Sequence, residues 1–568
     1  MLIRFATRSA LYAAVLLLCQ PQAALAADAA AQDKGDQGDE TAAAPAAQDL
    51  ASRLDATIAP YFQPDAPGAT VIVVKDGKTV LRRAYGMADT TKGVNMTPEM
   101  VLRIGSMTKQ FTATGILLLA DEGKLSVDDE IGKYLPDYPT QGRKITIEHL
   151  LTHTSGIVSY TGKPGFPQRA PQDTTVAAQI DSFKNDPLQF EPGSQWRYNN
   201  SSYYLLGAII EKVSGMPYPK FVQERIFVPL GMNHTAYEGH ERGQWPGAAG
   251  HSPLDKGFGP ARQLGKNQSY AAGELVSTVD DLATWDAAIA AGKLLKPATW
   301  QRAFTSYRLA DGKDSHYGYG WEMSLVQGEP AIGHSGSTRG FRSYGLRIPG
   351  KGLYVAVLTN SEAGTVVPDV VTRRAAAVAI GKPFPEFREV ALDAASLDAV
   401  AGVYTFEKDT QRVFRRDGEY LSLQRPGRGP LVLKAMAPDT FFVPDTVDWF
   451  VFQRDAASKA SGVTYHQDGR ALVHVRSGEA PPPRVVAKIP DAAFDAHLGR
   501  YQIQPGMVLE VVRDGGRYFV QPQGQRRLEI FPLSETRFFA RDVEAEIGFE
   551  DGNMVFRQGS RSHTGRRI

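Results

Sequence analysis

The alternation of hydrophobic and polar positions changes period along the chain, and this predicts where strands and helices lie. Residues 69–74 and 79–85 read as strands around Asp76-Gly77, a typical β-hairpin turn. Residues 341–348 and 353–359 predict a second pair of strands. Helical patterns are predicted over residues 50–61, 105–123, 146–151, 201–213, 280–291 and 370–380. Strands at both ends with helices between them predict an α/β sandwich whose first and last strands share one antiparallel sheet.

The last third of the chain contains a repeat. Gly402, Tyr404, Asp417-Gly418, Phe441-Phe442, Asp445 and Phe452 recur as Gly499, Tyr501, Asp514-Gly515, Phe538-Phe539, Asp542 and Phe549. Every pair differs by 97 positions, as in 499 minus 402. A repeat of this length indicates a duplicated small domain, and its short strands separated by glycine-containing turns predict two antiparallel barrels.

The N-terminus has the pattern of an export signal over residues 1–26. Arg4 and Arg8 precede an apolar run from Ala10 to Leu18, and Ala24-Leu25-Ala26 is a small-residue cleavage pattern. A retained membrane anchor is the alternative, but the apolar run is short for a bilayer span. Residues 27–48 carry few bulky apolar side chains and predict a disordered linker.

Composition then narrows the classes of function. The formal net charge is +1, from 63 basic and 62 acidic residues, so no strong field attracts nucleic acid or an anionic membrane. The one cysteine, Cys19, lies in the predicted signal. The processed chain therefore has no disulfide, thiolate nucleophile or cysteine metal site.

Ser106 and Lys109 form the first candidate catalytic motif, at the start of a long helical pattern after Gly105. Residues three apart share a helix face, so the lysine can activate the hydroxyl if its pKa is lowered by burial. Backbone N–H groups at the helix start are suited to stabilise an oxyanion. Taken alone, the pattern is more often an N-cap serine followed by a surface lysine.

Two further motifs follow. Tyr198 precedes a predicted helix, and a phenol near an ammonium can act as a base, while Asn200 is suited to bind a substrate amide and the lysine. His334, Gly336 and Ser337 precede the strand at Phe341. The glycine lets a substrate backbone approach, the Ser337 N–H is a second oxyanion donor, and His334 is a candidate to hold substrate or tune the tyrosine. Each motif alone also fits a capped loop or a structural histidine.

Occurring together in this order, the three motifs resemble those of the penicillin-binding protein and class C β-lactamase superfamily, and the branch of D-Ala-D-Ala carboxypeptidases, D-aminopeptidases and esterases in particular. Supporting stretches are residues 145–156, 229–232, 277–282 and 319–321, so the resemblance covers residues 50–380. It implies an α+β chain: an α/β sandwich of the β-lactamase/transpeptidase-like type with a central antiparallel sheet, followed by two small β-barrel-like domains. The expected boundaries are 1–26, 27–48, 49–383, 394–480 and 491–568.

The resemblance also implies a role for each matched residue. Ser106 is acylated, Lys109 and Tyr198 relay its proton, Asn200 positions substrate, and the N–H groups of Ser106 and Ser337 form the oxyanion hole. His334 stands where class C β-lactamases carry a lysine that binds the substrate carboxylate. Because imidazole is largely neutral near pH 7, this departure argues against efficient β-lactam hydrolysis and leaves acylation by penicillins open.

We therefore expect an exported enzyme, periplasmic or secreted, that hydrolyses D-amino-acid peptides through an acyl-enzyme on Ser106. The alternatives are a carboxylesterase, a weak β-lactamase, or a slowly turning over penicillin-binding sensor. Its partners are small peptides, esters or β-lactams, with no nucleic acid, no membrane span after processing, no cofactor and no metal. His149 and His153 have helical spacing, but Leu150 stands where a zinc protease carries glutamate, so we expect structural roles for both. Oligomeric state and the choice between Lys109 and Tyr198 as base stay open.

Overall fold

The computed structural model describes residues 40–241, 243–254, 257–362, 366–406, 410–425, 428–504, 507–522, 527–541, 545–558 and 561–568. The predicted export signal, 1–26, and residues 27–39 of the predicted linker lie outside these ranges. Within them, every helix is too short or too polar to cross a bilayer.

A six-stranded antiparallel sheet lies at the centre of the N-terminal domain, with strand order β10-β11-β12-β13-β1-β2. Its strands are β1 (Ala69–Lys75), β2 (Lys78–Tyr85), β10 (Glu322–Val326), β11 (Glu329–Thr338), β12 (Phe341–Ile348) and β13 (Leu353–Thr359). β1 pairs with β13, with Ala69 opposite Thr359. The first and last strands of the domain thus share one sheet, as predicted.

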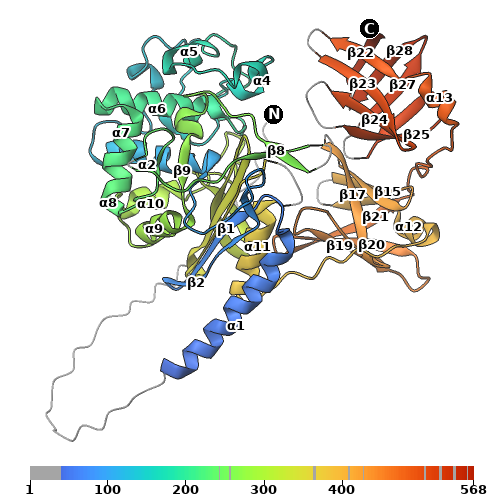
Figure 1. The fold of residues 1–568 in the computed structure, drawn as a ribbon, viewed down its shortest axis with the longest axis horizontal. Helices are drawn as coiled ribbons and strands as arrows, with labels where there is room; N and C mark the ends of the chain where they lie inside the picture. The colour runs from blue at the N-terminus through green and yellow to red at the C-terminus, as the bar shows by residue number, and fades with distance from the viewer. Residues whose placement is uncertain are drawn as a thin grey trace, which may run out of the picture. The chain divides into compact units, whose positions relative to one another are not determined.

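Alternation along the central strands places side chains in two separate cores, one on each face of the sheet. Ile72 of β1 packs in the core formed with α2, α6 and α9, whereas Val71 and Val73 pack in the core formed with α1 and α11. Residues of β13 divide in the same way. Figure 1 shows α11 beside the sheet, and Leu54 and Ile58 near the end of α1 pack in the same core, so the arrangement is the predicted α/β sandwich. These helices are α1 (Glu40–Ile58), α2 (Thr108–Asp121), α6 (Asn200–Ser214), α9 (Val279–Ala290) and α11 (Pro368–Ala379).

Shorter elements complete this domain. The short helices are α3 (Ile147–Leu151), α4 (Phe166–Arg169), α5 (Val176–Asp181), α7 (Tyr218–Val222), α8 (Val228–Leu230) and α10 (Pro297–Ala303). The small strands are β3 (Met87–Asp89), β4 (Val94–Asn95), β5 (Leu102–Arg103), β6 (Ala236–Tyr237), β7 (His251–Pro253), β8 (Phe258–Pro260) and β9 (Leu275–Ser277). β5 pairs with β9 and leads directly into the turn that carries Ser106.

The first helix begins earlier than the sequence predicted. α1 covers the last nine residues of the stretch that we predicted to be a disordered linker, 27–48. Its residues 42–44 are consecutive alanines, and alanine has the strongest intrinsic helix preference. The linker prediction rested on the shortage of bulky apolar side chains and gave this preference no weight.

Two closed eight-stranded barrels form the C-terminal part, as the repeat predicted (Figure 1, orange and red). The first comprises β14 (Gly402–Phe406), β15 (Thr410–Asp417), β16 (Tyr420–Arg425), β17 (Arg428–Ala437), β18 (Thr440–Phe442), β19 (Trp449–Arg454), β20 (Ala460–Gln467) and β21 (Arg470–Gly478). The second comprises β22 (Gly499–Gln504), β23 (Met507–Asp514), β24 (Arg517–Pro522), β25 (Leu528–Pro532), β26 (Arg537–Ala540), β27 (Glu546–Glu550), β28 (Asn553–Gln558) and β29 (Arg561–Arg567). A short helix precedes each: α12 (Ala394–Val400) and α13 (Asp491–Asp495).

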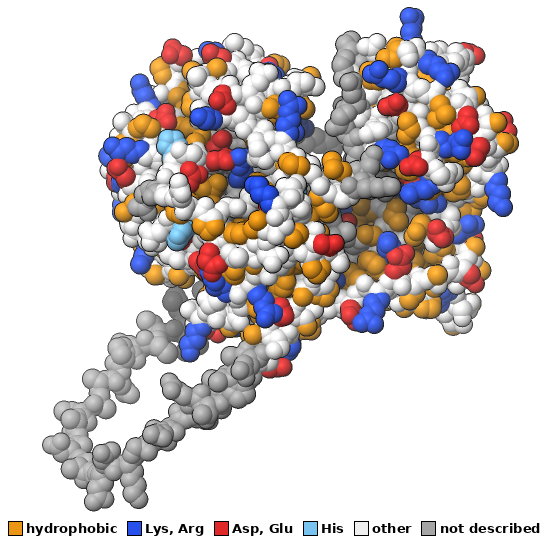
Figure 2. Space-filling view, in the orientation of Figure 1, with side chains coloured by type: hydrophobic (Ala, Val, Ile, Leu, Met, Phe, Trp, Pro, Cys, Tyr) orange, Lys and Arg blue, Asp and Glu red, His pale blue; other side chains and the backbone are white. Residues whose placement is uncertain are grey.

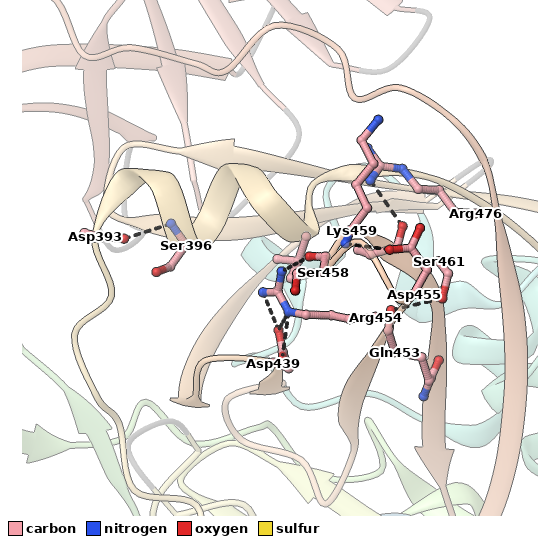
Figure 3. A network of polar contacts seen from close by, with 12 residues as sticks. Asp393, Ser396, Asp439, Gln453, Arg454, Asp455, Ser458, Lys459, Ser461 and Arg476 are labelled. Atoms are coloured by element: carbon pink, nitrogen blue, oxygen red, sulfur yellow. Dashed lines mark hydrogen bonds and ion pairs between the residues drawn. The ribbon is translucent and has the colours of Figure 1, made fainter.

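The two barrels repeat specific contacts as well as strand order. The Tyr404 hydroxyl donates to the carbonyl of Val400 at 2.8 Å, and the Tyr501 hydroxyl donates to that of His497 at 2.9 Å. Arg416 pairs with Asp398 as Arg513 pairs with Asp495. Other interactions belong to the first barrel, such as the pair of Arg454 with Asp439 in Figure 3.

Charges of both signs are interspersed on the face of the molecule shown in Figure 2. This mixing accords with a formal net charge of +1.

Candidate active site

The turn before α2 holds Ser106 at a point where two backbones meet. Gly105 adopts φ +51°, which favours glycine, and a Cβ there would lie 2.7 Å from the Ser337 nitrogen. Gly336 on β11 is equally confined, because its Cβ would lie 2.0 Å from the Ile104 oxygen. The Ser343 hydroxyl donates to that same oxygen at 2.8 Å. The two glycines, Gly105 and Gly336, therefore allow the backbone of β11 to lie in close contact with the segment that carries Ser106.

Lys109 lies one turn into the helical segment and is completely buried. Its Nζ is 3.0 Å from Ser106 Oγ, 2.9 Å from Asn200 Oδ1 and 2.8 Å from the carbonyl oxygen of Ala272. All three are uncharged. The predicted neighbourhood of Ser106 and Lys109 is thus present, and Ala272 is a partner that no sequence pattern indicated.

Tyr198 and Asn200 reach the site from the start of α6. Asn199 caps this helix, its side chain accepting from the Ser202 N–H at 3.0 Å, so the cap fixes the residues on either side of it. The Asn200 amide donates to Thr161 Oγ1 at 3.1 Å while its oxygen faces Lys109. The Tyr198 ring lies 4.8 Å from Lys109 Nζ, and its hydroxyl is hydrogen-bonded with Ser106.

His334, on β11, is buried beneath the site instead of lining it. Its Nε2 is 2.8 Å from the Tyr317 hydroxyl and its Nδ1 is 2.6 Å from the carbonyl oxygen of Ser335. Both ring nitrogens are thus engaged within the protein, and the ring centroid is 6.1 Å from that of Tyr198. Of the two roles considered for His334, this geometry favours tuning the tyrosine over holding substrate.

The electrostatics of the site follow from burial. Burial lowers the pKa of Lys109 well below its ordinary range, although the charge of Glu322 opposes the shift. Burial and the nearby Lys109 lower the pKa of His334 to about 3. Burial also raises the pKa of Tyr198, and its hydrogen bond with Ser106 opposes that rise. At neutral pH these shifts favour a neutral imidazole and a neutral phenol beside an amine poised to lose its proton.

His153 is a neighbour of the site that sequence reasoning did not place there. α3 ends at Leu151, so His149 and His153 do not share a helix. His149 Nδ1 accepts from the Thr146 N–H and closes a capping box, which is a structural role. His153 adopts φ +60°, accepts from the Asn199 N–H at 3.2 Å, and lies 4.4 Å from the Tyr198 ring. The position of His153 depends on the backbone turn that follows α3, and the sequence does not indicate the conformation of that turn.

Glu322 is a second residue that the sequence did not single out. It begins β10, opposite Gly333 of β11, and its Oε1 accepts from the Ser335 hydroxyl at 3.2 Å. His334 Nδ1 lies 4.0 Å from the same oxygen. The carboxylate is half-buried, and burial raises its pKa to about 7. It influences the pKa values of both Lys109 and Tyr198.

The structure therefore brings every predicted site residue to one place. Ser106, Lys109, Tyr198 and Asn200 form one connected set of contacts. Gly336 and Ser337 border the turn of Ser106, and His334 lies behind Tyr198. A half-buried hydroxyl, an adjacent amine with a lowered pKa and converging backbone N–H groups are the components of nucleophilic acyl transfer. The fold and the site together define a serine hydrolase with a β-lactamase-like sandwich.

Comparison with known proteins agrees with that class. A family model described as "Beta-lactamase" matches residues 47–380, more than half of the chain, and the chain belongs to this family. The resemblance inferred from the motifs, the fold class and the enzyme class are confirmed.

Individual relatives extend over different lengths of the chain. "Penicillin-binding protein 4*" of Bacillus subtilis is 25% identical over 503 residues, covering 85% of this chain and 90% of that protein. A D-aminopeptidase of Gluconobacter oxydans is 28% identical over 327 residues, covering 56% of this chain and 60% of that protein. A solved structure, the octameric penicillin-binding protein homologue from Pyrococcus abyssi, covers 75% of this chain and 99% of its own, with TM-score 0.53 and 26% identity.

Proposed function

We propose that the protein is an exported hydrolase of D-amino-acid peptides and amides that works through an acyl-enzyme on Ser106. The observation that carries this proposal is the uncharged, completely buried setting of Lys109, with its Nζ 3.0 Å from Ser106 Oγ. An ordinary surface lysine is protonated and cannot accept a proton, whereas burial lowers its pKa and frees a lone pair.

Counting hydrogen-bond donors around Lys109 supports its role as the base. A neutral amine has two N–H donors and one lone pair. Asn200 Oδ1 and the carbonyl of Ala272 are acceptors only, and they take both donors. The lone pair is left for the Ser106 hydroxyl proton. Proton transfer to Nζ then accompanies attack of Oγ on the substrate carbonyl carbon, which forms the new C–O bond.

Tyr198 fits the complementary role of proton donor. Its raised pKa keeps the phenol protonated, so it is poorly suited to be the initial base. Its hydrogen bond with Ser106 places the hydroxyl next to the reacting carbon, where the leaving group departs. The leaving nitrogen or oxygen takes the Tyr198 proton as its bond to carbon breaks, and Lys109 returns a proton to the phenol. Water then repeats the attack and releases Ser106.

The oxyanion is assigned to the N–H groups of Ser106 and Ser337. Contacts at Gly105 and Gly336 bring the Ser337 nitrogen beside the turn of Ser106, and this closeness supports the assignment. Two preorganised donors are typical of acyl-transfer sites.

The substrate class rests on the relatives, among them a D-aminopeptidase. Export rests on the pattern of residues 1–26, which would place the enzyme beside D-amino-acid peptides of a cell wall. Ester hydrolysis is a second candidate, because His334 is buried and neutral and offers no cation to select a charged substrate.

Intact-protein mass spectrometry tests the nucleophile. We expect one fluorophosphonate adduct on the wild type and none on Ser106→Ala. Ser126→Ala is the matched control, because Ser126 is exposed and only caps a turn, and it should label like the wild type. An adduct that persists in Ser106→Ala, or no adduct on folded wild-type protein, would refute the proposal.

Turnover assays test the reaction and the substrate class. We expect D-alanine p-nitroanilide to be hydrolysed at least about tenfold faster than its L enantiomer, the factor of one lost well-oriented contact. A penicillin adduct that forms without turnover of any amide or ester would instead identify a sensor. Preference for p-nitrophenyl esters with no amide hydrolysis would identify an esterase.

A further inference from the structure

Among the described residues, no strand pairs with one edge of β11 beside the candidate nucleophile. β10 pairs with β11 only as far as Gly333, opposite Glu322. From His334 to Thr338, β12 is the strand partner given by the described ladder, and it occupies the other edge. Ser335 and Ser337 are exposed along this stretch. On this edge the Ser335 carbonyl is already engaged by His334 Nδ1, so an extended peptide that continues the sheet would pair with the backbone of Ser337 and pass along the side chain of Ser335.

Glu322 lies where such a peptide would meet β10. As the first residue of β10, it adjoins the beginning of the free edge. Its Oε1 accepts from Ser335 Oγ at 3.2 Å, so the carboxylate is held against the exposed strand. Nothing in the catalytic scheme above uses this charge.

No cation pairs with the Glu322 carboxylate on the side that faces the candidate site, among the described residues. Arg373 lowers its pKa but is itself paired with Asp369 and Asp468. Asp369 raises the pKa of Glu322. Within the described ranges, the other titratable groups close to Glu322 are Lys109 and His334, whose lowered pKa values favour the neutral forms. The phenols of Tyr198, Tyr317 and Tyr344 also interact with Glu322, and burial raises their pKa values, which keeps them neutral.

The reaction scheme determines which part of the substrate faces Glu322. The leaving atom must lie beside the Tyr198 hydroxyl that protonates it. The Tyr198 ring lies against His334, and His334 Nδ1 is 4.0 Å from Glu322 Oε1. The leaving group therefore departs along Ser335 toward Glu322, while the acyl group extends in the opposite direction, past Ser337.

We infer that Glu322 and Ser335 form a leaving-group subsite that accepts uncharged or cationic amines and rejects a leaving group with a free carboxylate. This inference rests on the proposed function and refines it: the enzyme cleaves D-aminoacyl amides and internal peptide bonds in preference to a C-terminal D-Ala-D-Ala bond. Glu322 is a specificity-determining residue, and it takes no proton in the reaction.

A matched pair of substrates tests the inference. D-alanyl-D-alanine and D-alanyl-D-alaninamide share the scissile bond and differ only in the terminal carboxylate. We expect the wild type to favour the amide, and Glu322→Gln to raise the ratio of kcat/KM, carboxylate over amide, by about tenfold, as expected when one charge repulsion at several ångströms is removed. D-alanyl-diaminoethane has a cationic leaving group, so its kcat/KM relative to that of the amide should fall in the same variant.

Glu329→Gln is the control, since Glu329 lies at the far end of β11 and pairs with Lys351 and Lys382, so it should leave the ratio unchanged. A wild-type pH series gives a second reading that needs no variant. Because the pKa of Glu322 is about 7, the carboxylate-to-amide ratio should fall between pH 6 and pH 8 as Glu322 ionises.

A ratio that does not change in Glu322→Gln, or a wild-type ratio that does not fall with pH, overturns this inference alone. Failure to cleave any of the three substrates overturns the proposed function together with it.

Discussion

Lys109 in the active site and Arg513 in the second barrel show opposite ways to accommodate a basic side chain. Lys109 is completely buried and faces three uncharged oxygens. Arg513 is partly exposed and pairs with Asp495 at 2.7 Å and Asp491 at 3.0 Å. Burial lowers the pKa of Lys109, whereas the hydrogen bond with Asp495 raises that of Arg513.

The difference distinguishes a side chain that stabilises the fold from one that is suited to proton transfer. Arg416 and Asp398 repeat the pair of Arg513 and Asp495 at the same offset, so the pairing belongs to the barrel fold. Lys109 lacks a carboxylate partner in direct contact among the described residues. A fold that only needed to neutralise this amine would supply one, whereas a base must be able to lose its proton.

The largest expected effect on kcat/KM comes from placing a permanent positive charge at position 109. Lys109→Arg keeps a basic side chain but remains protonated, so it cannot accept the Ser106 proton. We expect kcat/KM for p-nitrophenyl acetate to fall by about 10³-fold, within the usual contribution of a general base. Arg513→Lys is the contrasting control and should change the rate by less than about twofold, because the ion pairs of Arg513 are with Asp491 and Asp495 and the substitution keeps the charge. Wild-type-like activity in Lys109→Arg would remove lysine as the base.

Gly336→Ala should give the next largest effect, a loss of stability caused by a steric clash. The new Cβ would lie 2.0 Å from the Ile104 oxygen and 2.2 Å from Ser343 Oγ, so β11 must shift away from the turn of Ser106. We expect a loss of about 2–3 kcal/mol in the free energy of unfolding, typical of overpacking. Gly132→Ala meets no atom within 4 Å and should stay within about 0.5 kcal/mol of the wild type. Equal stability of the two variants in urea titrations would contradict the close contact.

The pH dependence should be a smaller, graded effect. Because burial lowers the pKa of Lys109, the neutral amine is present without strongly alkaline conditions. As pH falls through that lowered pKa, Nζ is protonated and kcat/KM should drop about tenfold per pH unit. The profile is measured with p-nitrophenyl acetate, subtracting the rate of Ser106→Ala. A rate that keeps rising tenfold per unit up to pH 10 would indicate a lysine with an ordinary pKa.

The smallest expected effect compares the two barrels with each other. Tyr404→Phe and Tyr501→Phe each remove one hydroxyl that donates to a carbonyl at the same offset. We expect each to lower the free energy of unfolding by about 1 kcal/mol, the usual net value of one hydrogen bond. Thermal denaturation of the two variants measures this, and activity should not follow. A large loss of stability in only one variant would show that this hydrogen bond contributes differently to the two barrels.

The residues of the candidate site were predictable because their contacts are local or belong to recognised motifs. The spacing of Ser106 and Lys109 on one helical turn is enough to place the amine near the hydroxyl. The central sheet followed from strand patterns at both ends of the domain, and the barrels followed from the repeat. These features depend on periodicity, which a sequence displays directly.

Glu322, His153 and Ala272 were not predictable because their positions depend on tertiary register. Glu322 reaches the site only because β10 begins opposite Gly333. His153 reaches Tyr198 through a turn with positive φ that follows the end of α3 at Leu151, and no residue pattern indicates the direction of that turn. Ala272 contributes a backbone oxygen, for which residue type carries no signal.

The strand order also determines how the chain must assemble. Each barrel pairs consecutive strands, so its ladder can grow as the chain lengthens and closes with its own last strand. β1, by contrast, needs β13, and Ala69 meets Thr359 only after nearly the whole hydrolase domain has been made. Long-range pairing of this kind is slow and leaves hydrophobic strand surface uncovered in the meantime. The hydrolase domain is therefore the part of the chain more prone to aggregate during folding, because the hairpin of β1 and β2 keeps a strand edge uncovered until β13 is made.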